Sequence, residues 1–124
     1  MEIKMRWLLD TNAIIYIQKG LVKEPLPNAE IFISVISKIE LLSYPNLTSI
    51  EKNFLNDFLS NIHIIPLSPE IETLTIDMRI KHKLKIPDAI ICASAILSES
   101  VLITNDLQLA QIPELKIKSL TLSP

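Results

Sequence analysis

The sequence predicts an α/β fold, a three-layer α/β/α sandwich around a central, mostly parallel sheet of about five strands. Two observations lead to this prediction. Short apolar runs alternate along the chain with longer segments that have helical periodicity. The apolar runs are hydrophobic at nearly every position rather than at every second position, which is typical of parallel strands covered by helices on both faces.

The expected strands are the short apolar runs, each bounded by polar or turn residues. In chain order they cover residues 5–9, 31–35, 63–67, 101–104 and 116–120. The expected helices lie between them and cover residues 11–19, 37–44, 48–61, 69–84 and 87–99. Because no linker or internal repeat separates these elements, one domain is expected over residues 1–124.

The expected helices carry start and stop residues. Gly20 follows the first helix and Pro45 the second, and both residue types interrupt helices. Three helices begin with a capping residue that is followed at suitable spacing by an acid or a proline. These pairs are Ser37 with Glu40, Thr48 with Glu51, and Ser68 with Pro69.

The chain is rich in apolar residues for its length. They make up 48% of its 124 residues, and the mean hydropathy is +0.35. This surplus predicts a surface for a homodimer or a partner protein, with segments 41–47 and 54–59 as candidates and burial in the core as the alternative. No apolar run reaches the roughly 20 residues of a membrane span, and no signal peptide is recognisable. We therefore expect a cytoplasmic protein with no membrane partner.

Composition also excludes several classes of site. Cys92 is the only cysteine, so a disulfide within the chain and a cysteine-rich zinc site are excluded, and we expect Cys92 in the core. Gly20 is the only glycine, which excludes glycine-rich phosphate loops and makes nucleotide cofactors unexpected. The formal net charge is -2, so the overall charge does not favour binding of a nucleic acid. A nucleic acid would have to be bound by a local site.

Four acids lie where the predicted sheet would bring them to one edge. Asp10 ends the first strand and Asp106 follows the fourth, while Glu40 and Asp88 lie near the starts of two helices. In a parallel sheet, the carboxyl ends of the strands and the helix starts that follow them share one edge. All four carboxylates are therefore expected at a common rim.

Each acid also has a purely structural interpretation. Asp10 can cap a helix, Glu40 can complete a capping box, Asp88 can act as a first-turn acid, and Asp106 can cap a short helix. Taken singly, capping is the more frequent use of such acids. Together, however, the four adjoin the most apolar segments of the chain, which favours a shared site.

Converging carboxylates need a compensating charge. At 4–6 Å each pair repels by about 3–4 kcal/mol at an effective dielectric constant near 20. Either some of their pKa values rise or a hard cation binds, and oxygen ligands suit Mg²⁺ or Mn²⁺ better than zinc. His63 and His82 lack partners at ligand spacing and are expected to be structural. A carboxylate-bound Mg²⁺ favours hydrolysis of a phosphodiester.

Four segments resemble a known family in order and spacing. They are LLDTNAII (8–15), ISVISKIELL (33–42), KIPDAIICASAI (85–96) and VLITND (101–106). They resemble the PIN domain, and in particular the small VapC-type toxin ribonucleases. The resemblance implies a parallel-sheet α/β/α fold, an Mg²⁺- or Mn²⁺-dependent endoribonuclease that acts on RNA, dimerisation, and inhibition by a cognate antitoxin protein.

The resemblance also implies roles for individual residues. Asp10, Glu40, Asp88 and Asp106 match the acidic quartet. Asp10 and Asp88 correspond to the most direct metal ligands. Glu40 and Asp106 would complete the cluster directly or through water, and one of them would orient or deprotonate the attacking water.

Neighbouring residues are candidates for supporting roles. Asn12 and Thr104 resemble the positions that hold the ligand carboxylates by hydrogen bonds, with local turn and capping bonds as the alternative. The basic stretch 79–85 suggests RNA phosphate contacts from Arg79 and Lys83. A solvated helix face is the alternative interpretation of this stretch.

Two other functions use acids at the ends of parallel strands. A phosphoryl-accepting receiver domain is disfavoured because Thr11 and Asn12 replace the expected paired acids, and a haloacid-type phosphatase because DTN lacks the second aspartate of DxD. A non-catalytic module whose acidic rim binds a basic partner stays open.

Overall fold

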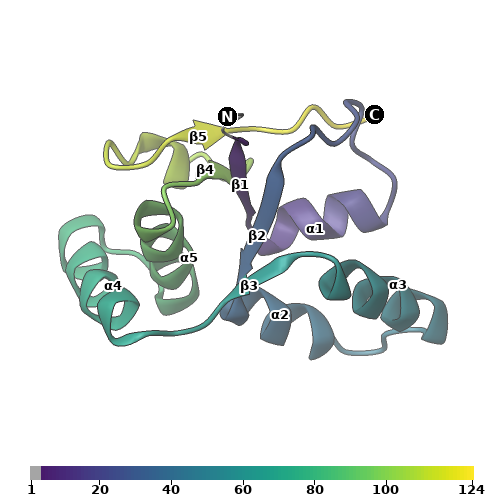
Figure 1. Ribbon diagram of the computed structural model, residues 1–124, viewed down its shortest axis with the longest axis horizontal. Helices are drawn as coiled ribbons and strands as arrows, with labels where there is room; N and C mark the ends of the chain where they lie inside the picture. The colour runs from purple at the N-terminus through teal and green to yellow at the C-terminus, as the bar shows by residue number, and fades with distance from the viewer. Residues whose placement is uncertain (1–3) are drawn as a thin grey trace.

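The computed structural model describes residues 4–124 and contains one five-stranded sheet (Figure 1). The strands are β1 Arg6–Leu9, β2 Glu30–Ser34, β3 His63–Ile65, β4 Val101–Ile103 and β5 Ile117–Lys118. Their order across the sheet is β3-β2-β1-β4-β5, and all four strand pairs are parallel. The carboxyl ends of all five strands therefore lie at one edge.

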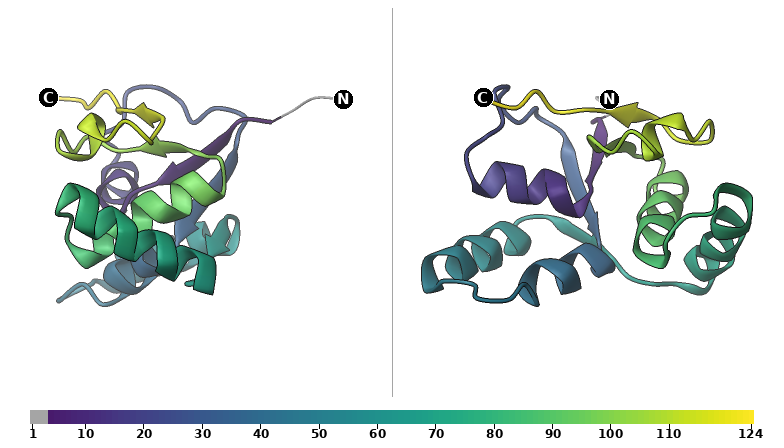
Figure 2. Two further views of the ribbon diagram at one scale, coloured as in Figure 1. Left: turned by 90° about the vertical axis from the view of Figure 1, so that its left-hand side faces the viewer. Right: turned by 180° about the vertical axis from the view of Figure 1, so that it is seen from behind.

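Helices cover both faces of the sheet. They are α1 Thr11–Gln18, α2 Val35–Leu42, α3 Ser49–Ser60, α4 Pro69–His82 and α5 Ile86–Leu97, with a short 3-10 helix, η1 Leu109–Gln111. Figures 1 and 2 show α1 and α3 on one side of the sheet and α4 and α5 on the other, with α2 below. The predicted three-layer α/β/α fold is confirmed.

The alternation of side chains along β1 divides the core into two parts. Trp7 and Leu9 pack with residues of α1 and α3, whereas Leu8 packs with residues of α4 and α5. β1 is fully flanked by β2 and β4, and these three residues are at most 4% exposed. A strand that is buried on both faces has no polar side, which explains its continuous apolar run.

The start of α2 differs from the prediction. The helix begins at Val35, directly after β2, and Ser34 caps it by accepting a hydrogen bond from the Ile36 amide at 3.1 Å. The predicted capping box of Ser37 and Glu40 is therefore wrong, and Glu40 lies in the second turn instead of opening the helix. The strand passes into the helix without a loop, so the polar residue at the strand end is the one that meets the free amides.

The other predicted caps are confirmed. Thr48 and Glu51 form both bonds of a capping box at the start of α3. Ser68 accepts a hydrogen bond from the Ile71 amide, and a proline occupies the first turn of α4. Cys92 lies in the core as predicted, and burial raises the pKa of its thiol to about 12.

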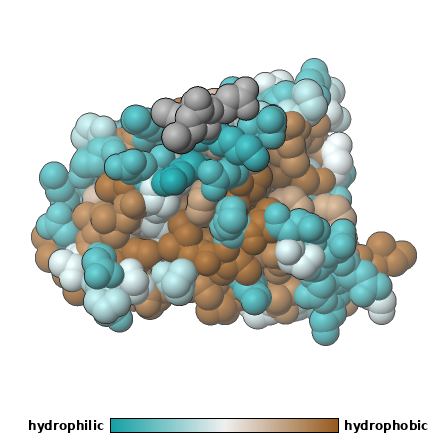
Figure 3. Space-filling model, in the orientation of Figure 1, coloured by the Kyte–Doolittle hydropathy of each residue, from teal (hydrophilic) through white to brown (hydrophobic). Residues whose placement is uncertain are grey.

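Apolar side chains also reach the surface. Figure 3 shows apolar residues across the lower half of the face seen in Figure 1. The most exposed large apolar side chains are Ile50 at 82%, Leu107 at 79% and Ile80 at 77%. Within residues 4–124, no helix has the length and apolarity to cross a membrane.

Candidate metal centre

The structure brings the four predicted acids together around one hollow at the carboxyl edge of the sheet. Asp10 follows β1, Glu40 comes from α2, Asp88 from the first turn of α5, and Asp106 from the loop after β4. The hollow has a volume of about 200 Å³. Its other lining residues are Thr11, Asn12, Ile15, Tyr44 and Ile91.

Asp10 is the most deeply buried of the four acids, at 7% exposed. Its Oδ1 accepts a hydrogen bond of 2.7 Å from the Ala13 amide, so it also caps α1, as its structural interpretation predicted. Burial raises the pKa of this carboxyl, and the negative charges of Asp106 and Asp88 add to the rise, whereas interactions with Thr104 and Ala13 oppose it. The hydrogen bonds from the protein therefore do not fully offset the cost of burying the ionised Asp10 carboxylate.

Thr104 connects two of the acids. It directly follows β4 and is 1% exposed. Its hydroxyl oxygen accepts a hydrogen bond from the Asp106 amide at 3.1 Å, and its interaction with Asp10 lowers the pKa of that carboxyl. Asn12 lines the same hollow with an exposed side chain. The sequence thus located two polar neighbours of the acids.

Glu40 is held by a residue that the sequence interpretation did not select. The Thr11 hydroxyl donates to Glu40 Oε1 at 2.7 Å and also lies 2.9 Å from the Ser37 hydroxyl. Ser37 is completely buried and lies one helical turn before Glu40. The spacing of Ser37 and Glu40 was visible in the sequence, but its meaning is a shared contact with α1 and not a helix cap.

Asp88 and Asp106 complete the hollow on its other side. Burial raises the pKa of Asp88, followed by the charges of Asp106 and Glu40, and Lys85 opposes the rise. Asp106 is more exposed, and its Oδ1 accepts hydrogen bonds from the Gln108 and Leu109 amides at 2.8 and 3.4 Å. Asp88 is a first-turn acid of α5, as its structural interpretation predicted, and it also faces the hollow. The predicted helix cap at Asp106 is wrong, because η1 begins at Leu109 with Gln108 as its N-cap, and Asp106 instead accepts these bonds within the loop.

The donor set of the hollow fits a partly hydrated hard cation. Among residues 4–124, no three acid, histidine or cysteine side chains are placed so that they could hold an ion together. Mg²⁺ does not require such a cage, because it usually keeps several waters and takes only one or two carboxylates. Asp10 and Asp88 are the two buried or half-buried carboxylates with raised pKa values, so they are the ones that a cation would stabilise most.

Both histidines have contacts outside the hollow, in agreement with the structural role expected for them. His82 Nε2 lies 2.9 Å from Glu114 Oε2. His63 stacks on Phe32 with a centroid distance of 4.8 Å and lies 3.7 Å from Glu30. Neither ring lines the hollow, so the ligand atoms that its side chains offer to a cation are oxygens.

The basic stretch between α4 and α5 lies outside the hollow. Arg79 Nε donates to the Leu84 carbonyl oxygen at 3.1 Å and so closes the end of α4. Lys81 lies 3.5 Å from Glu114, and Lys83 is exposed in a left-handed backbone conformation with φ of 57°. None of these side chains lines the hollow, so any contact they make with a ligand lies beyond it.

Comparison with protein-family models gives a match to the PIN domain over residues 7–115. The chain belongs to the PIN domain family. This match covers all four acids, and the resemblance found in the sequence is thereby confirmed. Family membership supports a hydrolase of the nuclease class. PIN nucleases generally depend on a divalent metal ion.

Solved structures of the same fold include several toxin–antitoxin complexes. A toxin–antitoxin complex from Klebsiella pneumoniae is 30% identical, with a TM-score of 0.69, and the match covers 87% of this chain and 93% of that one. VapBC2 from Rickettsia felis, bound to a DNA fragment from its promoter, is 24% identical with a TM-score of 0.78 and coverage of 94% and 99%. VapBC-1 from nontypeable Haemophilus influenzae is 21% identical with a TM-score of 0.77 and coverage of 93% and 98%. A comparison with curated proteins finds no match.

The raised pKa values give this PIN domain a specific pH dependence. Asp10 and Asp88 bind protons more tightly in the folded chain than in the unfolded chain, where the ordinary value is 3.8. The contribution of each carboxyl to the free energy of unfolding therefore falls as the pH rises above about 4. Asp10→Asn removes one such group and keeps the oxygen that caps α1, so its stability relative to the wild type should increase with pH.

Urea titrations in the presence of a chelator at about pH 4 to 8 measure this difference. Asp57→Asn is a matched control because Asp57 is exposed on α3. It should show no such trend. A difference between Asp10→Asn and the wild type that stays constant or shrinks as the pH rises would contradict the role assigned to burial.

Proposed function

We propose that this PIN domain is an Mg²⁺- or Mn²⁺-dependent endoribonuclease and the toxin of a type II toxin–antitoxin pair. The observation that supports the activity is the convergence of Asp10, Glu40, Asp88 and Asp106 around one hollow at the carboxyl edge of the sheet. The observation that supports the toxin role is the likeness to a toxin–antitoxin complex at 30% identity over 87% of the chain.

In this proposal, Asp10 and Asp88 hold the cation, with Glu40 and Asp106 contributing directly or through water. The cation, when bound, would polarise the phosphate and lower the pKa of a water molecule. It would also offset the negative charge of the rim, which otherwise repels RNA. Asp10 can hold the cation from a fixed position, because the Ala13 amide donates to one of its carboxylate oxygens.

Glu40 is the residue we propose to orient the attacking water and accept its proton. Thr11 donates to Oε1 and thereby restrains the carboxylate, so we assign the attacking water to Oε2. Asp106 can assist from the opposite side, because two backbone amides hold its Oδ1. Both carboxylates thus meet the substrate in a defined orientation.

The exposed basic residues are proposed to contact RNA phosphates next to the acid rim. Lys83 is the better candidate, because Arg79 already donates to the Leu84 carbonyl oxygen and contributes to the end of α4. Lys83→Glu should weaken RNA binding and reduce its dependence on salt, since one phosphate contact is lost. A binding isotherm with unchanged affinity and salt slope would remove Lys83 from the RNA surface.

We also propose a cognate antitoxin and a homodimer as the protein's assemblies. The exposed apolar side chains, such as Ile50 and Ile80, are the supporting observation. A second candidate function is a non-catalytic module whose acid rim binds a basic partner. It is favoured by the absence, within the described chain, of three acid, histidine or cysteine side chains that could hold an ion together.

Substitution of Asp88 tests the activity. Asp88→Asn should reduce Mg²⁺-dependent cleavage of RNA by about 10²-fold or more, because several kcal/mol of transition-state stabilisation depend on the cation. The fold should persist, since the change removes a raised-pKa carboxyl. Cleavage of a labelled RNA and the melting temperature measure both effects, with Asp57→Asn as the control. Wild-type cleavage by Asp88→Asn would exclude the proposed centre.

Substitution of Thr11 tests the orientation of Glu40. Thr11→Val preserves shape but removes the hydroxyl that donates to Glu40, so Mn²⁺ affinity or cleavage should fall about 10-fold, as for other groups that orient ligands. Thr11→Ser keeps the hydroxyl and should restore most of the loss.

Calorimetric titration with Mn²⁺ separates the two candidate functions, because a module that only binds a basic partner should give no saturable Mn²⁺ site in the wild type.

A further inference from the structure

The pairing of β4 with β5 stops where the chain reaches Asp106. The Thr104 amide donates to the Lys118 carbonyl oxygen at 3.1 Å and continues the ladder of the two strands. Bonds in a parallel ladder are evenly spaced, so the next one in this series would run from the Asp106 amide to the Leu120 carbonyl oxygen. The Asp106 amide instead donates to the Thr104 hydroxyl oxygen at 3.1 Å. The backbone at Asp106 has thus turned away from the neighbouring strand.

The side chain of Asn105 replaces the backbone in the next step of the ladder. Its Nδ2 donates to the Leu120 carbonyl oxygen at 3.0 Å, and its Oδ1 accepts from the Leu120 amide at 2.7 Å. A carboxamide offers the same kinds of donor and acceptor as a peptide unit. Leu120 is 5% exposed, so its two backbone groups would be costly to leave unpaired. Asn105 satisfies both of them without the backbone of Asp106.

The segment that Asn105 contacts is itself held in place. Leu120 belongs to the core cluster that contains residues of α1 and α3. The Thr121 amide then donates to Glu24 Oε1 at 2.9 Å. Figure 1 shows the end of the chain crossing from β5 to the loop that follows α1. Asn105 therefore joins the loop of Asp106 to a well-anchored part of the fold.

We infer that Asn105 is a positioning residue for Asp106 in the acid centre. By bonding to both backbone groups of Leu120, Asn105 ends the β4–β5 ladder and allows the chain to turn, so that Asp106 lines the hollow. The amides that follow then hold Asp106 Oδ1. The effect of Asn105 on a cation rests on the proposed function, whereas its effect on the position of Asp106 does not.

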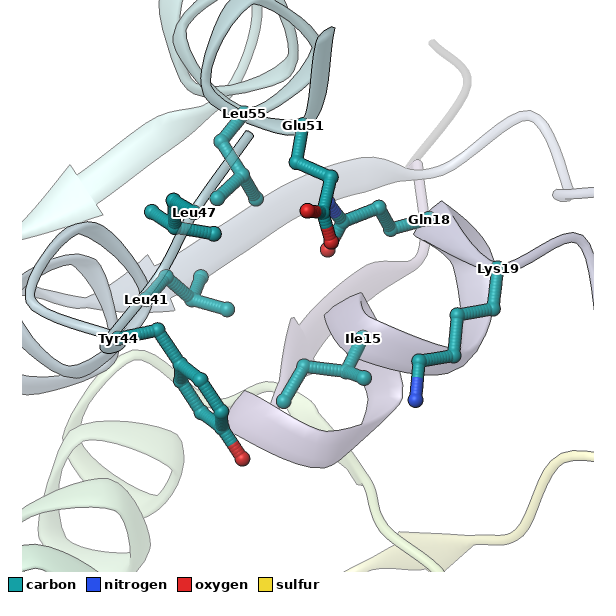
Figure 4. Close-up of a pocket in the computed structure, with 8 residues that line it drawn as sticks. All are labelled: Ile15, Gln18, Lys19, Leu41, Tyr44, Leu47, Glu51 and Leu55. Carbon is teal, nitrogen blue, oxygen red and sulfur yellow. The ribbon is translucent and has the colours of Figure 1, made fainter. Parts of the chain in front are cut away.

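This contact is separate from the apolar hollow on the other side of the acids. That second hollow lies between α1, the end of α2 and α3, and Ile15 and Tyr44 line both hollows (Figure 4). All of its lining residues fall between Ile15 and Leu55 in the chain. A change at Asn105 should therefore reach the Asp106 side of the acid centre and leave the side formed by α2 unaltered.

Nuclear magnetic resonance relaxation of the backbone amides tests the effect on Asp106, with the full chain in the presence of a chelator. The Asp106 amide should have an order parameter near about 0.85 in the wild type, and Asn105→Ala should lower it toward about 0.6, because the loop loses both bonds to Leu120. The Glu40 amide should keep its value. Asn61→Ala is the matched control, since Asn61 Nδ2 also donates to a backbone carbonyl oxygen, at the exposed end of α3.

A second variant keeps this measurement decisive if Asn105→Ala does not fold. Asn105→Asp has the same shape and keeps the acceptor for the Leu120 amide, but it lacks the donor for the carbonyl oxygen. Its order parameter at Asp106 should lie between those of the wild type and Asn105→Ala. An unchanged order parameter at Asp106 in the folded variants would overturn the inference.

Calorimetric titration with Mn²⁺ tests whether Asn105 acts through Asp106. Asn105→Ala should weaken Mn²⁺ binding about tenfold, as for other groups that orient ligands. In a chain that already carries Asp106→Asn, the same substitution should have little further effect, because the two changes remove one shared contribution. Additive losses in the double variant would point to a general structural role and overturn the inference, as would equal Mn²⁺ affinities of Asn105→Ala and the wild type.

The two measurements also separate this inference from the proposed function. A wild type that binds no Mn²⁺ and cuts no RNA would count against the ribonuclease, and the order parameters would then decide the role of Asn105 alone. A wild type that binds Mn²⁺ and cuts RNA, with an Asp106 loop that is insensitive to Asn105, would overturn only the inference.

Discussion

The repulsion among four carboxylates at one edge of a parallel sheet is the constraint on which the site depends. β1 and β4 are neighbours in the sheet, so Asp10 and Asp106, which follow them, must lie close together. α2 and α5 add Glu40 and Asp88 from the two sides. Burial by the surrounding apolar core then makes the charged forms of Asp10 and Asp88 more costly, which is the condition under which a divalent cation gains most from binding.

The fold restrains two of these acids through hydrogen bonds from backbone amides. The Ala13 amide holds Asp10 at the start of α1, and the amides after Asp106 hold that carboxylate in its loop. The capping and shared-site interpretations of the sequence are therefore compatible for Asp10, whereas Asp106 accepts loop amides without capping η1. Glu40 differs, because a side chain from another helix, Thr11, fixes its position. A change in the packing of α1 against α2 would therefore displace the Glu40 carboxylate without altering the local structure of either helix.

The polar and apolar parts of this edge lie side by side. The acids occupy one hollow, and aliphatic residues of α1, α2 and α3 form the next, with Ile15 and Tyr44 between them. Tyr44 lies just beyond the end of α2, so the length of that helix decides where the aromatic ring stands.

The sequence by itself determined the elements and the approximate placement of the acids. Strand and helix periods, the stops at Gly20 and Pro45, and the caps at Thr48 and Ser68 depend on neighbouring residues, and such local patterns are readable in one chain. The alternation of strands and helices then implied a parallel sheet, and a parallel sheet implied a shared edge for the acids.

Only the tertiary structure decided how the side chains meet. Thr11 and Glu40 are separated by 29 residues along the chain, and their contact exists because α1 and α2 pack together. The same packing gave Ser37 a partner other than a helix terminus and enclosed the hollow next to the acids. Periodicity fixes which face of a helix is apolar, but the positions of neighbouring helices depend on how whole side chains fill the space between them.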